Sequence, residues 1–97
     1  MLYISNYSIP SETLVEAMKR FTSGDPNAEM PEGTRLIGRW HNMASKKGVA
    51  IIDADDYAAA ASWALQWNDL MDLTLEPAVE DQTCGELCAA KLASLEE

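Results

Sequence analysis

The pattern of apolar and polar residues begins with a strand followed by a helix. Residues 1–8 (MLYISNYS) are rich in strand-favouring side chains and are bounded by Pro10, which indicates a first strand. Ser11 then offers an N-cap for a short amphipathic helix over residues 11–22. The apolar residues of that helix recur at helical spacing along one face: Leu14, Ala17, Met18 and Phe21.

Residues 22–33 (TSGDPNAEMPEG) hold two glycines and two prolines, and this composition predicts a loop. Loops of about this length are uncommon in compact domains and often form lids or binding edges. A solvated connector is the alternative interpretation.

A hairpin and a second helix follow the loop. Residues 34–42 and 48–53 are strand-like, and the intervening SKKG indicates a tight turn between them. Asp55 can then cap a helix over residues 56–67, whose run of alanines favours helix. One stripe of that helix carries its apolar residues: Tyr57, Ala60, Ala61, Ala64 and Trp67.

The last part of the chain predicts one more strand and one more helix. Residues 69–79 alternate apolar and polar side chains as a strand does, with Pro77 at its end or on a sheet edge. Thr83 and Glu86 fit a capping box before a helix over residues 82–96. The apolar face of this helix must dock somewhere.

This β-α-β-β-α-β-α order predicts an α+β fold, a ferredoxin-like sandwich with sheet order 4-1-3-2 and both main helices on one face. We expect a single domain over residues 1–97, with a core of residues 1–79 and a C-terminal helical extension over 82–96. The stretch RLIGRWHN, residues 35–42, then lies in an edge strand.

The strands carry apolar residues on both faces, for example Tyr3 and Tyr7 against Leu2 and Ile4. Two helices cover only one face of such a sheet, so the other face needs a partner. Two copies that pack their sheets face to face would form a homodimeric α/β barrel and close its edges. The alternative is a monomer whose C-terminal helix folds over that face.

The composition of the chain limits the classes of partner that it can bind. Sixteen acidic residues against seven basic ones give a net charge of −9, which repels nucleic acid and anionic membranes. There is no apolar run of spanning length and no signal-peptide pattern, so we expect a cytoplasmic protein. Cys84 and Cys88 are interpreted as reduced thiols at packed positions.

Four segments carry a family resemblance: MLYISNYSI, PEGTRLIGRWH, GVAIIDADD and WALQWNDLMDLTLEPAV. They resemble the domain-of-unknown-function family 3303, which is similar to branches of the dimeric α/β-barrel superfamily. The resemblance runs from about Met1 to Val79 and leaves the last helix as an extension. The superfamily includes cofactor-free monooxygenases, isomerases, haem-dependent enzymes and stress-response proteins, so the resemblance implies a pocket more readily than a chemistry.

Strand alternation places Leu36, Gly38, Trp40 and Asn42 on one face and Ile37, Arg39, His41 and Met43 on the other. If the second face turns inward, Arg39 could hold a carboxylate and His41 could move a proton near neutral pH. These two residues are the candidate catalytic pair. The alternative is that both point outward or join salt bridges between copies.

The candidate ligand-binding residues are aromatic, with one amide: Tyr7, Trp40, Trp63, Trp67 and Asn68. Trp40 and Trp67 also fit the core, and Asn68 fits a left-handed helix end. Asp53, Asp55 and Asp56 resemble a metal triplet, but capping of the following helix explains them. No phosphate loop, metal cluster or nucleophile elbow is present, so we expect neither cofactor nor metal.

Three functions remain open. The first is a homodimer of unassigned activity that binds a small organic or anionic ligand between sheet and helices. The second is a cofactor-independent monooxygenase or isomerase that uses His41 and Arg39. The third is a structural or regulatory dimer without a ligand. Sequence alone does not decide whether the chain is an enzyme.

Overall fold

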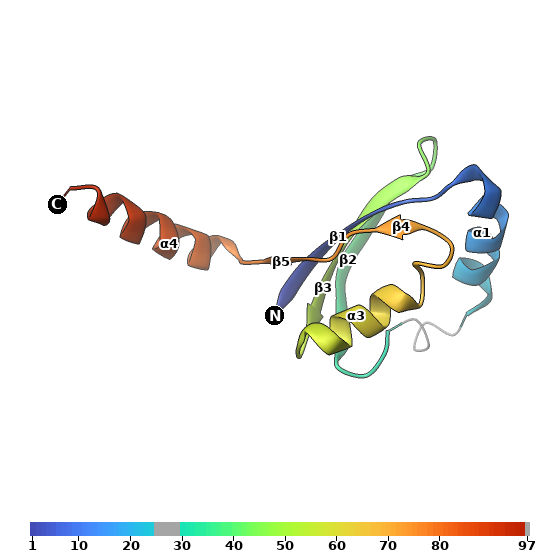
Figure 1. Ribbon diagram of the computed structural model, residues 1–97, viewed down its shortest axis with the longest axis horizontal. Helices are drawn as coiled ribbons and strands as arrows, with labels where there is room; N and C mark the ends of the chain where they lie inside the picture. The colour runs from blue at the N-terminus through green and yellow to red at the C-terminus, as the bar shows by residue number, and fades with distance from the viewer. Residues whose placement is uncertain (25–29, 97) are drawn as a thin grey trace.

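The computed structural model of the protein describes residues 1–24 and 30–96. In these residues five strands form one antiparallel sheet: β1 (Leu2–Ser8), β2 (Thr34–Asn42), β3 (Lys47–Ala54), β4 (Asp72–Leu73) and β5 (Glu76–Ala78). The helices are η1 (Ser11–Thr13), α1 (Leu14–Ser23), α3 (Tyr57–Leu65) and α4 (Asp81–Ser94). The strand order is β2-β3-β1-β4, and β5 also pairs with β1 (Figure 1). The predicted order of strands is therefore confirmed, with the fourth strand divided into β4 and β5.

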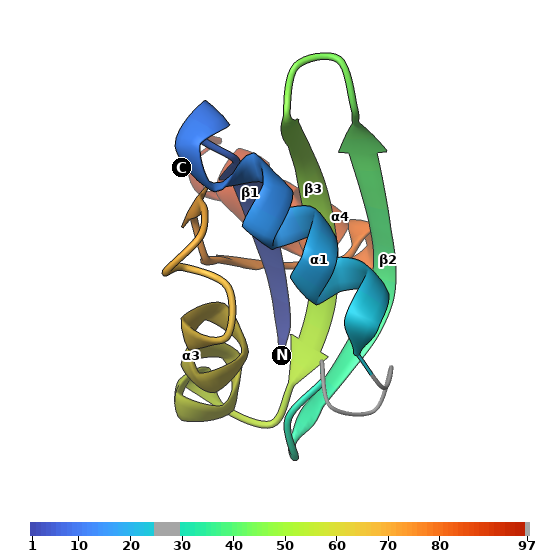
Figure 2. The same ribbon diagram turned by 90° about the vertical axis from the view of Figure 1, so that its right-hand side faces the viewer.

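The helices α1 and α3 lie on one side of the sheet, which we call the inner face (Figures 1 and 2). Tyr3 and Ser5 of β1 point to this face and are almost fully buried, whereas Leu2 and Ile4 point to the other, outer face and are only half-buried. The core forms between the inner face and α3, from Tyr3, Ala50, Ile52, Ala54, Ala60, Trp63, Ala64 and Trp67. The sheet is open, and no helix among the described residues lies over the outer face.

A β-bulge in β2 changes one prediction about that strand. Leu36 lies opposite Ile52 and Gly38 lies opposite Ile51, so Ile37 is an extra residue without a partner on β3. Residues directly opposite each other share a face, and Ile52 belongs to the core on the inner face. Leu36 therefore points to the inner face, and its predicted grouping with Gly38 and Trp40 is wrong.

The start of α3 differs from the prediction by one residue. Asp56 is the N-cap, because its Oδ1 accepts a hydrogen bond from the backbone N–H of Ala59 at 2.9 Å. Asp55 accepts a hydrogen bond from Arg35 Nη2 at 2.9 Å instead. The guanidinium of Arg35 thus binds the carboxylate of Asp55, and the carboxylate of Asp56 caps the helix. Tyr57, which was predicted to lie on the buried stripe, is 63% exposed.

The first helix also begins differently. Ser11 opens η1 rather than capping α1, and its Oγ accepts a hydrogen bond from Lys46 Nζ at 2.7 Å. The predicted loop over residues 22–33 begins late, because Thr22 and Ser23 still belong to α1. Residues 25–29 of that loop lie outside the described residues.

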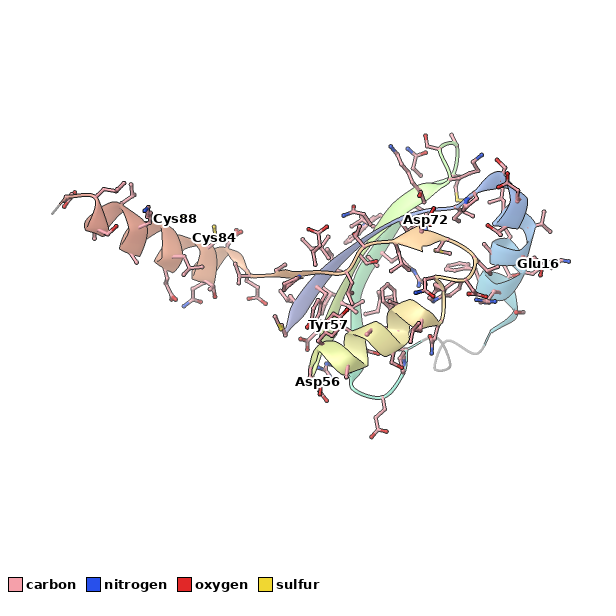
Figure 3. All side chains as sticks on the ribbon, in the orientation of Figure 1. Glu16, Asp56, Tyr57, Asp72, Cys84 and Cys88 are labelled. Atoms are coloured by element: carbon pink, nitrogen blue, oxygen red, sulfur yellow. The ribbon has the colours of Figure 1, made fainter. Side chains whose placement is uncertain are left out.

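The helix α4 projects away from the rest of the molecule, and its residues are exposed along its whole length (Figures 1 and 3). It begins at Asp81 after Glu80, so Thr83 lies inside the helix and the predicted capping box is wrong. Cys84 and Cys88 are free and exposed, with their sulfur atoms 4.0 Å apart, so the predicted packed positions are wrong as well. In this chain α4 does not cover the outer face.

None of the helices in the described ranges has the length and apolar character that a membrane span requires.

Candidate functional site

A row of three residues crosses the inner face near the β2–β3 turn. Tyr7 of β1 lies opposite Gly48 of β3, and Gly48 lies opposite His41 of β2. The hydroxyl of Tyr7 forms a hydrogen bond with His41 Nδ1, across the strand between them. A Cβ atom at position 48 would lie 2.7 Å from Tyr7 Cζ, closer than real Cβ contacts. The glycine therefore lets the phenol ring pass over β3 and reach the histidine.

Arg39 lies in the neighbouring row, opposite Ala50, which in turn lies opposite Ser5. These small side chains leave space above the sheet. The guanidinium Cζ of Arg39 lies 4.9 Å from the centre of the Phe21 ring on α1. The same ring meets His41 edge-on at 5.5 Å between centroids. Arg39 and His41 thus share one face, as strand alternation predicts, and that face is turned toward α1.

Burial sets the protonation of this cluster. It lowers the pKa of His41 below 6.5, and the positive charge of Arg39 lowers that pKa further, so the imidazole is neutral at pH 7. Burial also raises the pKa of Tyr7 and lowers the pKa of Arg39, while the attraction between these two groups offsets part of each shift. Tyr7 is therefore a neutral phenol at pH 7, and Arg39 remains a cation because a guanidinium keeps its proton in proteins.

An open cavity of about 300 Å³ lies between the inner face and α1. Its floor consists of small residues such as Ser5 and Ala50, and α1 supplies one wall. Large apolar side chains make up most of the lining: Leu14, Met18, Phe21, Trp63, Trp67, Met71 and Leu73. Tyr7, Arg39 and His41 also line the cavity, together with Lys46 and Lys47. The volume lies at the lower end of the range of small-molecule pockets.

Five of the seven predicted site residues line this cavity: Tyr7, Arg39, His41, Trp63 and Trp67. Trp40 and Asn68 do not. Trp40 is 61% exposed, and its ring lies against Gly38 on the outer face, so its predicted core position is wrong. Asn68 is exposed after α3, and Lys46 is the only non-glycine residue with positive φ in the described ranges. The predicted left-handed conformation of Asn68 is therefore wrong.

The family assignment follows from a sequence comparison. The model of a domain of unknown function (DUF3303) matches residues 1–92. The chain belongs to the DUF3303 family. The match covers the whole sheet, the cavity lining and most of α4, and so it extends beyond the predicted resemblance, which ended at about Val79. No curated protein matches the chain.

Trp63 and Trp67 of this DUF3303 domain line the cavity with their ring surfaces rather than with hydrogen-bonding groups. The indole N–H groups of Trp63 and Trp67 are buried, and neither has a hydrogen-bond partner within the described residues. Because those nitrogens are shielded, a molecule in the cavity would meet the ring faces and edges. The polar groups that line the cavity therefore come from other residues, among them Tyr7, His41 and Arg39.

An ion pair ties α1 to the segment after α3 beside the cavity. Arg20 donates to both carboxylate oxygens of Asp69, at 2.6 and 2.8 Å, and to the carbonyl oxygen of Gln66 at 2.7 Å. These hydrogen bonds lower the pKa of Asp69. Phe21, next to Arg20, lies 6.5 Å from the Trp67 ring. This contact fixes the end of α1 that carries the aromatic wall.

Sequence reasoning missed several of the lining residues. Phe21 and Met18 were recognised as one helix face, and that periodicity was the available signal for a wall. Gly48 had an ordinary explanation as part of a hairpin turn, and no sequence pattern links it to Tyr7. Lys46 and Lys47 were interpreted only as turn residues. Their position follows from the length of the hairpin, which returns them to the cavity mouth.

Proposed function

We propose that this DUF3303 domain binds a small organic ligand in the cavity between α1 and the inner face. The observation that carries the proposal is a roughly 300 Å³ apolar cavity whose lining brings Tyr7, His41 and Arg39 together. Ligand sites in proteins combine apolar walls with a few converging polar groups, and this cavity has that composition. The small residues on its floor keep the space open at the centre of the sheet.

A thermal-shift screen of small carboxylates and aromatic compounds tests this proposal, because a ligand that binds the native state raises its apparent stability. The matched variants are Met18→Trp, which fills the cavity from α1, and Val15→Trp, on an exposed position of the same helix. Compounds that stabilise the wild type and Val15→Trp should not stabilise Met18→Trp. The proposal is contradicted if the compounds stabilise both variants equally. It is also contradicted if no compound stabilises the wild type or either variant.

We also propose that two copies associate through their outer faces as a ferredoxin-like dimeric α/β barrel. The centre of that face is apolar, with Ile4 opposite Ile51 and Trp40 opposite Val49. Trp40 leaves 61% of its surface exposed in a single chain. A chain of 97 residues has a small core, and burial of this face in a second copy would add to its stability.

A second candidate function is catalysis without a cofactor, as a monooxygenase or an isomerase. It is favoured by a histidine that is neutral at pH 7 and oriented by Tyr7, because such an imidazole can accept a proton. In this proposal His41 is the base and Arg39 holds the developing negative charge. Conversion of a bound compound by the wild type but not by His41→Gln, which still binds it, distinguishes catalysis from binding. A structural or regulatory dimer would bind none of the compounds.

A further inference from the structure

The charges around the cavity differ from those of the chain as a whole. Acidic residues outnumber basic ones by sixteen to seven in the sequence. The described residues that line the cavity include three of the seven basic residues, Arg39, Lys46 and Lys47, and no aspartate or glutamate. The only histidine of the chain lies there too. The cavity is therefore an electropositive region of a strongly acidic protein.

The pair of Tyr7 and His41 adds a hydrogen-bond donor to this charge. If the phenol donates to Nδ1, the neutral imidazole carries its proton on Nε2. If Nδ1 donates instead, the phenol keeps its own proton for another acceptor. Either arrangement leaves the pair with one donor that it does not use internally. Both features favour a ligand group that accepts hydrogen bonds and carries negative charge.

The apolar walls of the cavity exclude a second charged group. Leu14, Met18, Trp67 and Leu73 offer no partner for one, and burial of an unpaired charge against such a wall is costly. The planar ring of Phe21 supports the guanidinium of Arg39 from α1, which holds that side chain beside the cavity. The cavity thus offers partners for one anionic group and apolar walls for an uncharged body.

We propose, on the basis of the binding function above, that the natural ligand is a small carboxylate with a single apolar body. Its carboxylate meets Arg39 and the free donor of the pair of Tyr7 and His41. Its aliphatic or aromatic body lies along Phe21 and Trp67. The fork of an arginine matches a carboxylate in two parallel hydrogen bonds, and this match selects the acid over its neutral analogues.

Isothermal titration calorimetry at pH 7 with 4-phenylbutanoate and the uncharged 4-phenylbutanamide tests this proposal. The two compounds share the apolar body and differ in charge, so we expect the carboxylate to bind about tenfold more tightly. Acetate, which lacks the body, should not bind detectably. Phenyl phosphate tests the head group, because tighter binding of this phosphate would overturn the assignment to a carboxylate.

Arginine variants identify the source of the preference. Arg39→Gln should bind the acid and the amide equally, and Arg39→Lys, which keeps the charge, should retain part of the preference. Arg35→Gln is the matched control, because Arg35 lies on the same strand but binds Asp53 and Asp55 outside the cavity. Circular dichroism of each variant checks that it is folded.

The outcomes separate this inference from the binding function. Equal binding of acid and amide by the wild type overturns the carboxylate assignment and leaves ligand binding intact. A preference that survives in Arg39→Gln also overturns it. If neither compound binds the wild type while Met18→Trp and Val15→Trp behave alike in the screen, the binding function fails as well.

Discussion

At the scale of single residues, the site depends on the absence of a side chain at Gly48. The Tyr7 ring occupies the space where a side chain on β3 would stand, and the backbone of Trp40 approaches from the other side. A glycine in a strand ordinarily weakens it, and close approach of other groups is the usual reason for its presence. Here the approach brings a phenol and an imidazole from two different strands into contact.

Gly48→Ala should therefore destabilise the protein by about 1–3 kcal/mol, because the added methyl group overlaps both the Tyr7 ring and the Trp40 carbonyl. Urea unfolding followed by tryptophan fluorescence measures the change. Gly85→Ala on α4 is the control, since nothing lies within 4 Å of the added group there, and it should cost no stability. A Gly48→Ala protein as stable as the wild type would disprove the close packing of Tyr7.

The protonation of His41 gives a second test at this scale. Its pKa is lowered by burial and by Arg39, so in the acid direction the unfolded chain takes up the proton before the native state does. Stability from this group is fully present above about pH 6.5 and decreases as the pH falls through the pKa of the folded state. Because the chain has one histidine, proton NMR reads this pKa directly. A value at or above 6.5 would contradict the burial of the ring.

At the scale of elements, the positions of the strands and helices could be predicted from periodicity, and their details could not. The predicted strands over residues 34–42 and 48–53 correspond closely to β2 and β3. The bulge at Ile37 was not predictable, because it arises from how β2 pairs with β3 rather than from the residues of β2. Arg39 and His41 lie beyond the bulge, so local alternation still placed that pair correctly relative to Trp40.

The sequence could not show which of Asp55 and Asp56 caps α3, because the residue that binds Asp55 is Arg35, on the distant strand β2. Asp56→Ala should reduce stability by about 1 kcal/mol through the lost cap. Asp55→Ala removes only one exposed hydrogen bond, the ion pair with Arg35, and should have a smaller effect. Thermal unfolding of the two variants compares them, and the reverse ranking would show that Asp55 is the cap.

At the scale of the whole molecule, one face of the sheet is organised around a cavity and the other is apolar and open. The exposure of Trp40 was not predictable from a strand pattern, which fixes two faces but not what lies over each. The same limit applies to α4, whose apolar residues indicated docking while the helix projects outward (Figure 1). The apolar outer face acquires a role if a second copy packs against it.

Light scattering tests the association of two copies. We expect a mass of about twice 10.7 kDa for the wild type at micromolar concentration. Ile51→Glu places a charge at the centre of the outer face and should give a monomer. Leu65→Glu makes the same kind of change at a 69% exposed position on α3 and should remain a dimer. A monomeric wild type would rule out the barrel.

The central claim is that a ligand enters the cavity between α1 and the inner face, and the three indole N–H signals in a ¹H–¹⁵N NMR spectrum test it most directly. Trp63 and Trp67 line the cavity and Trp40 lies on the outer face, so 4-phenylbutanoate should shift the first two signals and leave the third in place. Single Trp→Phe variants assign the signals. A shift of the Trp40 signal alone, or no shift at saturating ligand, would contradict the account.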